Sequence, residues 1–175
     1  VRTLTYSGLV AFLPLYLQQQ GMSLSVCSHL LFILLLSGAA GGIAGGYLSD
    51  RFGKTIVIFL SLALSPIFFY LFLHVGAGLQ PVVFALAGAT LLSSFSPIVV
   101  LAQELLFRQA AMASGFSLGF GIGIGGLGVG LVGLVIQYAG LALAINMLIC
   151  LPFVAACIAL TLKGRKTLEQ EGFAQ

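Results

Sequence analysis

Charged side chains fall into a few short clusters along this chain, and the segments between the clusters are strongly apolar. The uncharged stretches run from Arg2 to Asp50, from Lys54 to Glu104 and from Arg108 to Lys163. Each is about 50 residues long, whereas one transmembrane helix needs about 20 apolar residues. The pattern therefore predicts a helical hairpin, with two membrane spans, in each stretch.

Polar or glycine-containing breaks divide each stretch into two helices. The breaks lie at 18–21, 74–80 and 137–140, and they mark the turns opposite the charge clusters. The predicted helices cover 3–18, 24–48, 55–73, 81–103, 110–136 and 141–162, within one transmembrane domain over 1–162. The charged residues 163–175 are expected to form a C-terminal tail.

The charge clusters should all lie on one side of the bilayer, because a hairpin returns the chain to the side it left. They contain all seven cations of the chain, namely Arg2, Arg51, Lys54, Arg108, Lys163, Arg165 and Lys166. Short loops rich in Lys and Arg remain in the cytoplasm. We therefore expect this side, and both termini, to be cytoplasmic.

The composition indicates an all-α protein embedded in a lipid bilayer. The chain is 60% hydrophobic and 6% charged, which leaves too little polar surface for a soluble domain. The net charge of +3 is spread over the predicted inner loops, whereas a nucleic-acid site would need a clustered basic patch. Nucleic-acid binding is therefore not expected.

Residues that could support covalent or metal chemistry are sparse. The cysteines and histidines, which are Cys27, Cys150, Cys157, His29 and His74, lack the spacing of a zinc or haem site. Residues 123–128 formally fit G-x-G-x-x-G, but no strand precedes them and they lie within an apolar run. We expect no cofactor, no metal and no enzymatic activity.

Glycine is concentrated in the second and fifth predicted helices. In lipid there is little hydrophobic drive between helices, so the close backbone approach that glycine permits supplies packing energy. We expect these two helices to cross their neighbours at glycines, with Gly38, Gly42, Gly115, Gly119 and Gly123 as the candidates.

Four predicted helices contain an interior proline, at Pro14, Pro66, Pro97 and Pro152. An interior proline frees a carbonyl and kinks the helix, which suits a protein that changes shape. Prolines are also simply common in membrane helices, and both interpretations stay open.

The start of the chain is unusual. It opens on Val1 instead of Met, and residues 1–17 barely reach the minimum length of a span. We therefore expect that an upstream part is missing.

The connection between the second and third predicted helices carries the most specific motif. Its sequence is Gly46-Tyr47-Leu48-Ser49-Asp50-Arg51-Phe52-Gly53-Lys54. This closely resembles the glycine, Asp-Arg, glycine, basic signature that follows the second helix of each six-helix half in the major facilitator superfamily.

Two further segments narrow the resemblance. Residues 96–104 and Ala113-Ser114-Gly115 are similar to the fourth and fifth helices of the C-terminal half in fosmidomycin-resistance-type efflux proteins. Thr55 and Phe107 depart from the family pattern. The resemblance implies one half of a major facilitator fold, built as a 3+3 repeat.

The resemblance also implies a cytoplasmic latch that holds one conformation. Its candidate members are Gly46, Asp50, Arg51, Gly53, Lys54, Glu104 and Arg108. Glu104 and Arg108 are four residues apart and can pair on a helix, and Arg51 could share Glu104 through its planar guanidinium. Alternatively, these charges merely flank the spans and set their orientation.

Candidate residues of a substrate cavity follow one stripe of the fourth helix, which carries Thr90, Ser93 and Ser94. Tyr6, Ser7 and Ser37 are further candidates. Each hydroxyl could instead bond to its own helix. His29 is an ionisable residue within a predicted span, where it is either interfacial or a proton relay.

The implied function is proton-coupled efflux of a small molecule or drug by alternating access, as in an antiporter of the bacterial inner membrane. The first, second, fourth and fifth helices would face the cavity between two halves. The partner would be a missing N-terminal half, which would supply the coupling acid, or a second copy in a homodimer. The alternative is a non-transporting membrane protein, either a truncated gene product or an assembly partner.

Overall fold

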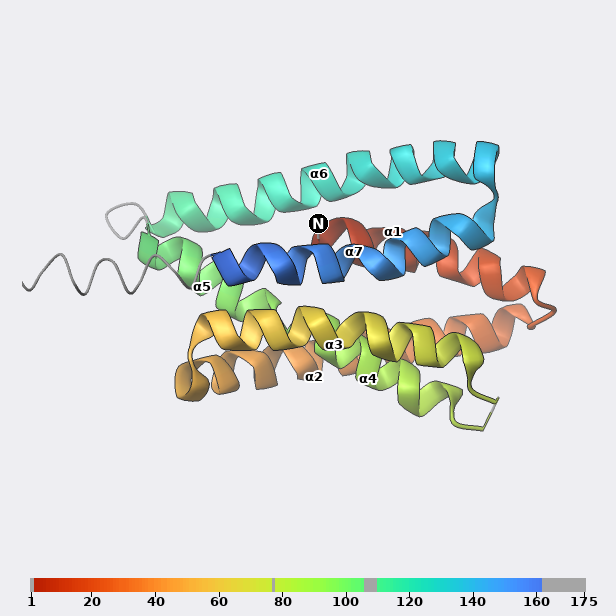
Figure 1. Cartoon of the computed structure of the whole chain (residues 1–175), viewed down its shortest axis with the longest axis horizontal. Coiled ribbons are helices and arrows are strands. Elements are labelled where there is room, and N and C mark those ends of the chain that lie inside the picture. Colours follow the sequence, from red (N-terminus) through yellow and green to blue (C-terminus); the bar gives the residue numbers. More distant parts are fainter. Residues whose placement is uncertain (1, 77, 106–109, 162–175) are drawn as a thin grey trace, which may run out of the picture.

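The computed structural model describes residues 2–76, 78–105 and 110–161, and in this part of the chain every regular element is an α-helix (Figure 1). The helices are α1 (Arg2–Gln19), α2 (Leu24–Phe52), α3 (Lys54–His74), α4 (Gln80–Ser93), α5 (Phe95–Leu105), α6 (Ala110–Ala139) and α7 (Leu141–Thr161). The predicted tail at 163–175 lies outside the described residues.

Five segments are long and apolar enough to cross a membrane: Leu24–Phe52, Lys54–His74, Gln80–Glu104, Ser114–Ala139 and Leu141–Ala159. Helix α1 is the sixth and is shorter, with 18 residues and two glutamines at its end. The described residues thus form an all-α integral membrane protein with five candidate spans and α1 as a sixth helix, which is consistent with the helical hairpins that the charge pattern predicted.

The helices pack as two interlocked groups of three. In the first group, α4 packs on both α2 and α3. In the second group, α1 packs in the same way on both α6 and α7. The remaining pair, α3 and α7, lie side by side at the front of the bundle (Figure 1). Exchanging α1 with α4–α5, α2 with α6 and α3 with α7 therefore leaves the contact pattern unchanged. This is the 3+3 arrangement of a major facilitator half.

The fourth span is broken into two helices, where the sequence predicted one over 81–103. Helix α4 ends at Ser93 and α5 begins at Phe95. Pro97 has no N–H to donate to the carbonyl of Ser93, so the helical ladder is interrupted there. The hydroxyl of Ser94 donates to the carbonyl of Leu91 at 2.9 Å. The backbone of Ser94 keeps φ −74° and ψ −11°, and α5 follows on from α4 (Figure 1).

Three tight turns contain glycine with positive φ. Gly21 (φ 86°) joins α1 to α2, Gly53 (φ 92°) joins α2 to α3, and Gly140 (φ 88°) joins α6 to α7. Only glycine adopts such angles without steric cost. Helix α2 accordingly continues past the predicted end at 48 and stops at Phe52, directly before Gly53.

Helices α2 and α4 meet at their backbones. A Cβ at Gly41 would collide with the backbone of Ala89, and one at Gly45 with the carbonyl of Ser93. From the other side, a Cβ at Gly88 would lie 2.8 Å from the carbonyl oxygen of Leu34. Glycine at these positions is what permits the contact.

Only some of the glycines predicted to pack against a neighbouring helix do so within the described residues. A Cβ at Gly38 would lie 3.0 Å from the side chain of Leu92, whereas the nearest atom to a Cβ at Gly42 would be the carbonyl oxygen of Leu92 at 3.9 Å, an ordinary contact. On α6 no described atom lies within 4 Å of a Cβ at Gly115, Gly119 or Gly123. Helix α6 instead contacts α1 through Gly125 and Gly128, which face Thr3 and Leu4. Within the described residues, Gly38 thus packs on α4, while α6 turns Gly125 and Gly128 toward α1, so the packing role predicted for Gly115, Gly119 and Gly123 stays a prediction.

Replacing Gly41 with alanine should lower the apparent unfolding temperature of the detergent-purified protein. The added methyl group has only backbone to displace, and overpacking of this kind costs about 1–3 kcal/mol. Gly42→Ala, one residue along the same helix, is the matched control and should unfold like the wild type. Equal unfolding temperatures for the two variants would contradict the backbone contact between α2 and α4.

Candidate functional site

The ends of α2, α3 and α5 come together at what we call the charged end of the bundle, which carries Asp50, Arg51, Lys54 and Glu104. Gly53 reverses the chain between α2 and α3. Its N–H donates to the carbonyl of Ser49 at 3.0 Å, and its carbonyl accepts from the N–H of Val57 at 3.3 Å. The turn therefore places the end of α2 next to the start of α3.

Lys54 and Glu104 form an ion pair between their Nζ and Oε1 atoms. The pair joins the first residue of α3 to the last turn of α5. Lys54 is largely covered, with 16% of its side chain exposed, whereas Glu104 is 51% exposed. Its energy should be at the modest level of a partly exposed pair, up to about 1 kcal/mol. The sequence named both residues for the latch but predicted other partners for Glu104.

Asp50 and Arg51 are exposed at the same end. The guanidinium of Arg51 lies over the ring of its neighbour Phe52, 5.8 Å from the centroid. Within the described ranges 2–76, 78–105 and 110–161, neither residue forms an ion pair. Arg108, the remaining member of the predicted latch, lies outside the described residues.

Helix α5 also contacts α2 and α6 through polar side chains. The hydroxyl of Ser96 donates to the carbonyl of Gly42 at 2.9 Å, and a Cβ at Gly46 would lie 3.6 Å from Ser96. The amide of Gln103 donates to the hydroxyl of Ser114 at 2.7 Å. Sequence reasoning assigned no role to this amide–hydroxyl pair. Among the described residues, α5 thus makes polar contacts with α2, α3 and α6, and its Ile98 and Leu101 pack against the apolar core.

The predicted cavity hydroxyls of α2 and α4 bond mainly to their own helices. Thr90 donates to the carbonyls of Leu86 and Ala87, at 2.8 and 3.0 Å. Ser37 donates to Leu34 at 3.2 Å, and the side chain of Ser94 is fully buried.

Thr90 and Ser93 lie together in an apolar groove of about 500 Å³ between α2, α3 and α4. Tyr6 and Ser7 are half-buried on α1 and do not line that groove. The structure therefore brings two of the six cavity candidates together and leaves the others apart. His29 is exposed, and its Nδ1 lies 2.8 Å from the carbonyl oxygen of Ser25.

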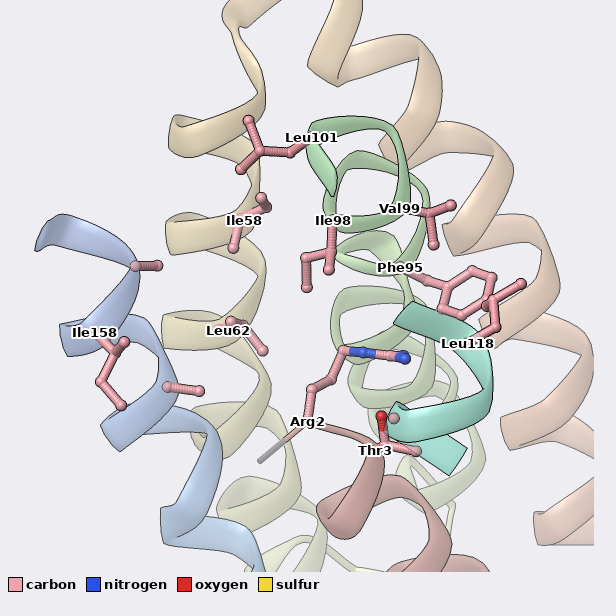
Figure 2. Close-up of a pocket in the computed structure, with 13 residues that line it drawn as sticks. Arg2, Thr3, Ile58, Leu62, Phe95, Ile98, Val99, Leu101, Leu118 and Ile158 are labelled. Atoms are coloured by element: carbon pink, nitrogen blue, oxygen red, sulfur yellow. The ribbon is translucent and has the colours of Figure 1, made fainter. Parts of the chain in front are cut away.

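Arg2 is half-buried, whereas the sequence grouped it with the cations expected at the inner membrane face. It lines a half-open pocket of about 350 Å³ together with residues of α3, α5, α6 and α7 (Figure 2). The guanidinium of Arg2 lies over the ring of Phe95 on α5, with Cζ 4.9 Å from the ring centroid.

The chain is similar to two curated transporters. It is 39% identical over 120 residues to the uncharacterized MFS-type transporter YfnC of Bacillus subtilis (strain 168), an alignment that covers 69% of this chain and 29% of the relative. It is 32% identical over 147 residues to the fosmidomycin resistance protein of Escherichia coli (strain K12), covering 83% of this chain and 36% of the relative. No family model and no solved structure matches the chain.

The six-helix architecture, the motif at Gly46–Lys54 and these relatives agree. The chain belongs to the major facilitator superfamily. It spans 29% and 36% of the lengths of the two relatives, so it corresponds to part of such a transporter.

Replacing Gly53 with alanine should destabilise the charged end. Its φ of 92° and ψ of 140° lie in a region that is nearly restricted to glycine, and a side chain there costs about 1–3 kcal/mol. The unfolding temperature in detergent should therefore fall. Gly76→Ala, a loop glycine with ordinary φ and no described atom within 4 Å of the new methyl, should leave it unchanged. An unaffected Gly53→Ala protein would contradict the strained turn.

Proposed function

We propose that this chain is the C-terminal six-helix half of a secondary transporter that exports a small molecule by alternating access. The observation that carries the proposal is the 3+3 packing of a facilitator half, joined to a 32% identity with a fosmidomycin resistance protein. Substrate in such transporters is bound near the membrane midplane between two halves, and rocking of the halves exposes it to each side in turn.

Helix α5 is the proposed moving part of the latch. The break at Ser94 separates it from α4, while three polar contacts hold it to α2, α3 and α6. Because these contacts are individually weak, they can be exchanged for others when the end opens. Asp50 and Arg51, which are exposed, are proposed to contact the other half in the closed state, together with Arg108.

The open glycine stripe of α6 supports a partner on that side. Gly115, Gly119 and Gly123 lie four residues apart with no described atom near them, next to the exposed rings of Phe116 and Phe120. A helix of the N-terminal half, or of a second copy, is proposed to pack there at close range.

Proton coupling is proposed to depend on the rest of the transporter. Among the described residues the acidic side chains are Asp50 and Glu104, and both lie at the charged end. A coupling acid at mid-membrane depth would therefore come from the other half. The membrane is proposed to be the bacterial inner membrane, with both termini in the cytoplasm.

The transporter that contains this chain should lower the accumulation of fosmidomycin in bacteria that lack their own exporter. Radiolabelled uptake, with and without a protonophore, measures the effect. The control is the same transporter with Gly41→Leu, which should fail to fold through the clash at Ala89. Unchanged accumulation with the wild-type transporter present in the membrane would contradict fosmidomycin export.

Neutralising either member of the ion pair, as in Lys54→Gln or Glu104→Gln, should slow export. Loss of a contact worth up to about 1 kcal/mol changes the ratio of the two conformations by about five-fold at most. Lys54→Arg keeps the charge and is the matched control. The double exchange of Lys54→Glu with Glu104→Lys should recover most of the rate. Failure of the exchange to recover it, with both single variants slow, would contradict a latch based on this pair.

A further inference from the structure

Two adjacent residues in the last turn of α5 contact different helices. The amide of Gln103 donates to the hydroxyl of Ser114 on α6 at 2.7 Å, whereas Glu104 forms the ion pair with Lys54 on α3. Consecutive side chains of a helix point about 100° apart, because one turn contains about 3.6 residues. This turn of α5 therefore joins the two three-helix groups of the bundle, with α3 in the first group and α6 in the second.

The two contacts differ in charge and in exposure. Gln103 and Ser114 are both half-buried and uncharged, so a hydrogen bond that opens there leaves a poorly solvated donor and acceptor, which is costly. Glu104 is 51% exposed, so water can hydrate its carboxylate when it leaves Lys54. Salt also screens an exposed ion pair but not a neutral hydrogen bond. The contact with α3 is therefore easier to break than the contact with α6.

The start of α5 has an anchor of its own. The hydroxyl of Ser96 donates to the carbonyl of Gly42 on α2 at 2.9 Å, close to the point where α4 ends and α5 begins. Gln103 lies further along α5, about 10 Å from Ser96 in the direction of the helix axis. A tilt about Ser96 would move the end of α5 while its start stays on α2. The packing of α5 is also more extensive on α6 than on α3.

We infer that Gln103 is a positioning residue of the transport cycle. Through Ser114 it keeps the end of α5 on α6, so that the two helices move together when Lys54 and Glu104 separate. The inference rests on the proposed transport function and deepens it, because it says which contact of the latch opens and which persists. Ser114 directly precedes Gly115, where the other half is proposed to pack. A shift of that half can therefore reach the ion pair through Gln103.

Spin-label distances in the whole transporter test the inference without a substrate. The labels are attached to cysteines introduced at three exposed positions, Ile56 on α3, Val100 on α5 and Met112 on α6, after the native cysteines have been replaced by serine. Glu104→Gln removes the ion pair, and raising the salt from about 0.1 M to about 1 M screens it in the wild type. Under both conditions we expect a second, longer α3–α5 distance and a single, unchanged α5–α6 distance.

Gln103→Leu removes the amide and keeps a side chain of similar size. It should broaden the α5–α6 distance and lower the maximal rate of export by about two- to ten-fold, the range for one hydrogen bond. The substrate concentration at half-maximal rate should not change, because Gln103 acts through α6. Ser114→Ala, a smaller change in the packing, should broaden the same distance, while Ser114→Thr keeps the hydroxyl and should behave like the wild type. Gln20→Leu, which removes an exposed amide at the opposite end, is the matched control.

Three outcomes would overturn the inference. The first is an α5–α6 distance that splits together with the α3–α5 distance in Glu104→Gln, because α5 would then leave both helices. The second is an α3–α5 distance that stays single both in Glu104→Gln and at high salt. The third is slower export by Gln103→Leu with an unchanged α5–α6 distance. Failure of the proposed function is separate, because it appears as absent fosmidomycin export by the wild type and leaves all the distances measurable.

Discussion

The contact on which the rest of this fold depends is the backbone approach of α2 to α4. An apolar side chain is as well solvated by lipid as by the side chains of a neighbouring helix, so there is little hydrophobic drive to bring helices together. Helices in a membrane are therefore held together by close packing and hydrogen bonds. Gly41 and Gly45 on α2, with Gly88 on α4, allow the two backbones to touch. Leu34 of α2 and Leu91 of α4 are buried beside this contact. Because α4 is the first part of the fourth span, this contact also sets where α5, the second part, begins.

The break at Ser94 gives the second part of that span a different role. Helix α4 is held by backbone packing, which has little freedom to slide because interiors are close-packed. In the part of the chain that the structure describes, α5 is joined to α2 and α6 by hydrogen bonds and to α3 by an ion pair, in addition to the apolar packing of Ile98 and Leu101.

Much of the fold follows from the sequence because charge is excluded from the hydrocarbon of the bilayer. The positions of Asp50, Lys54 and Glu104 predict how many spans exist and which of their ends share a side. Glycine spacing predicts a stripe but not its partner, since the stripe through Gly38 and Gly42 has the same period as the one through Gly41 and Gly45. Contact with α4 decides between them, and that is a tertiary property.

Prolines and Arg2 show two further limits of a single sequence. Pro14, Pro66 and Pro152 lie within continuous helices, whereas Pro97 accompanies a break, because tolerance depends on whether neighbours satisfy the freed carbonyl. The charge of Arg2 predicts a membrane surface, whereas its side chain is half-buried beside Phe95 of α5. This packing is a tertiary property that the sequence does not reveal.

The turns at the end opposite the charged end have a consequence for how the chain enters the membrane. The segments 20–23 and 75–79, and the turn at Gly140, contain no Asp, Glu, Lys or Arg. With the proposed cytoplasmic orientation of the charged end, these are the segments that pass through the hydrocarbon during synthesis, where each charged residue would cost about 2.5–3.5 kcal/mol. In that orientation each hairpin can insert as a pair of helices, while its cations stay on the side of synthesis.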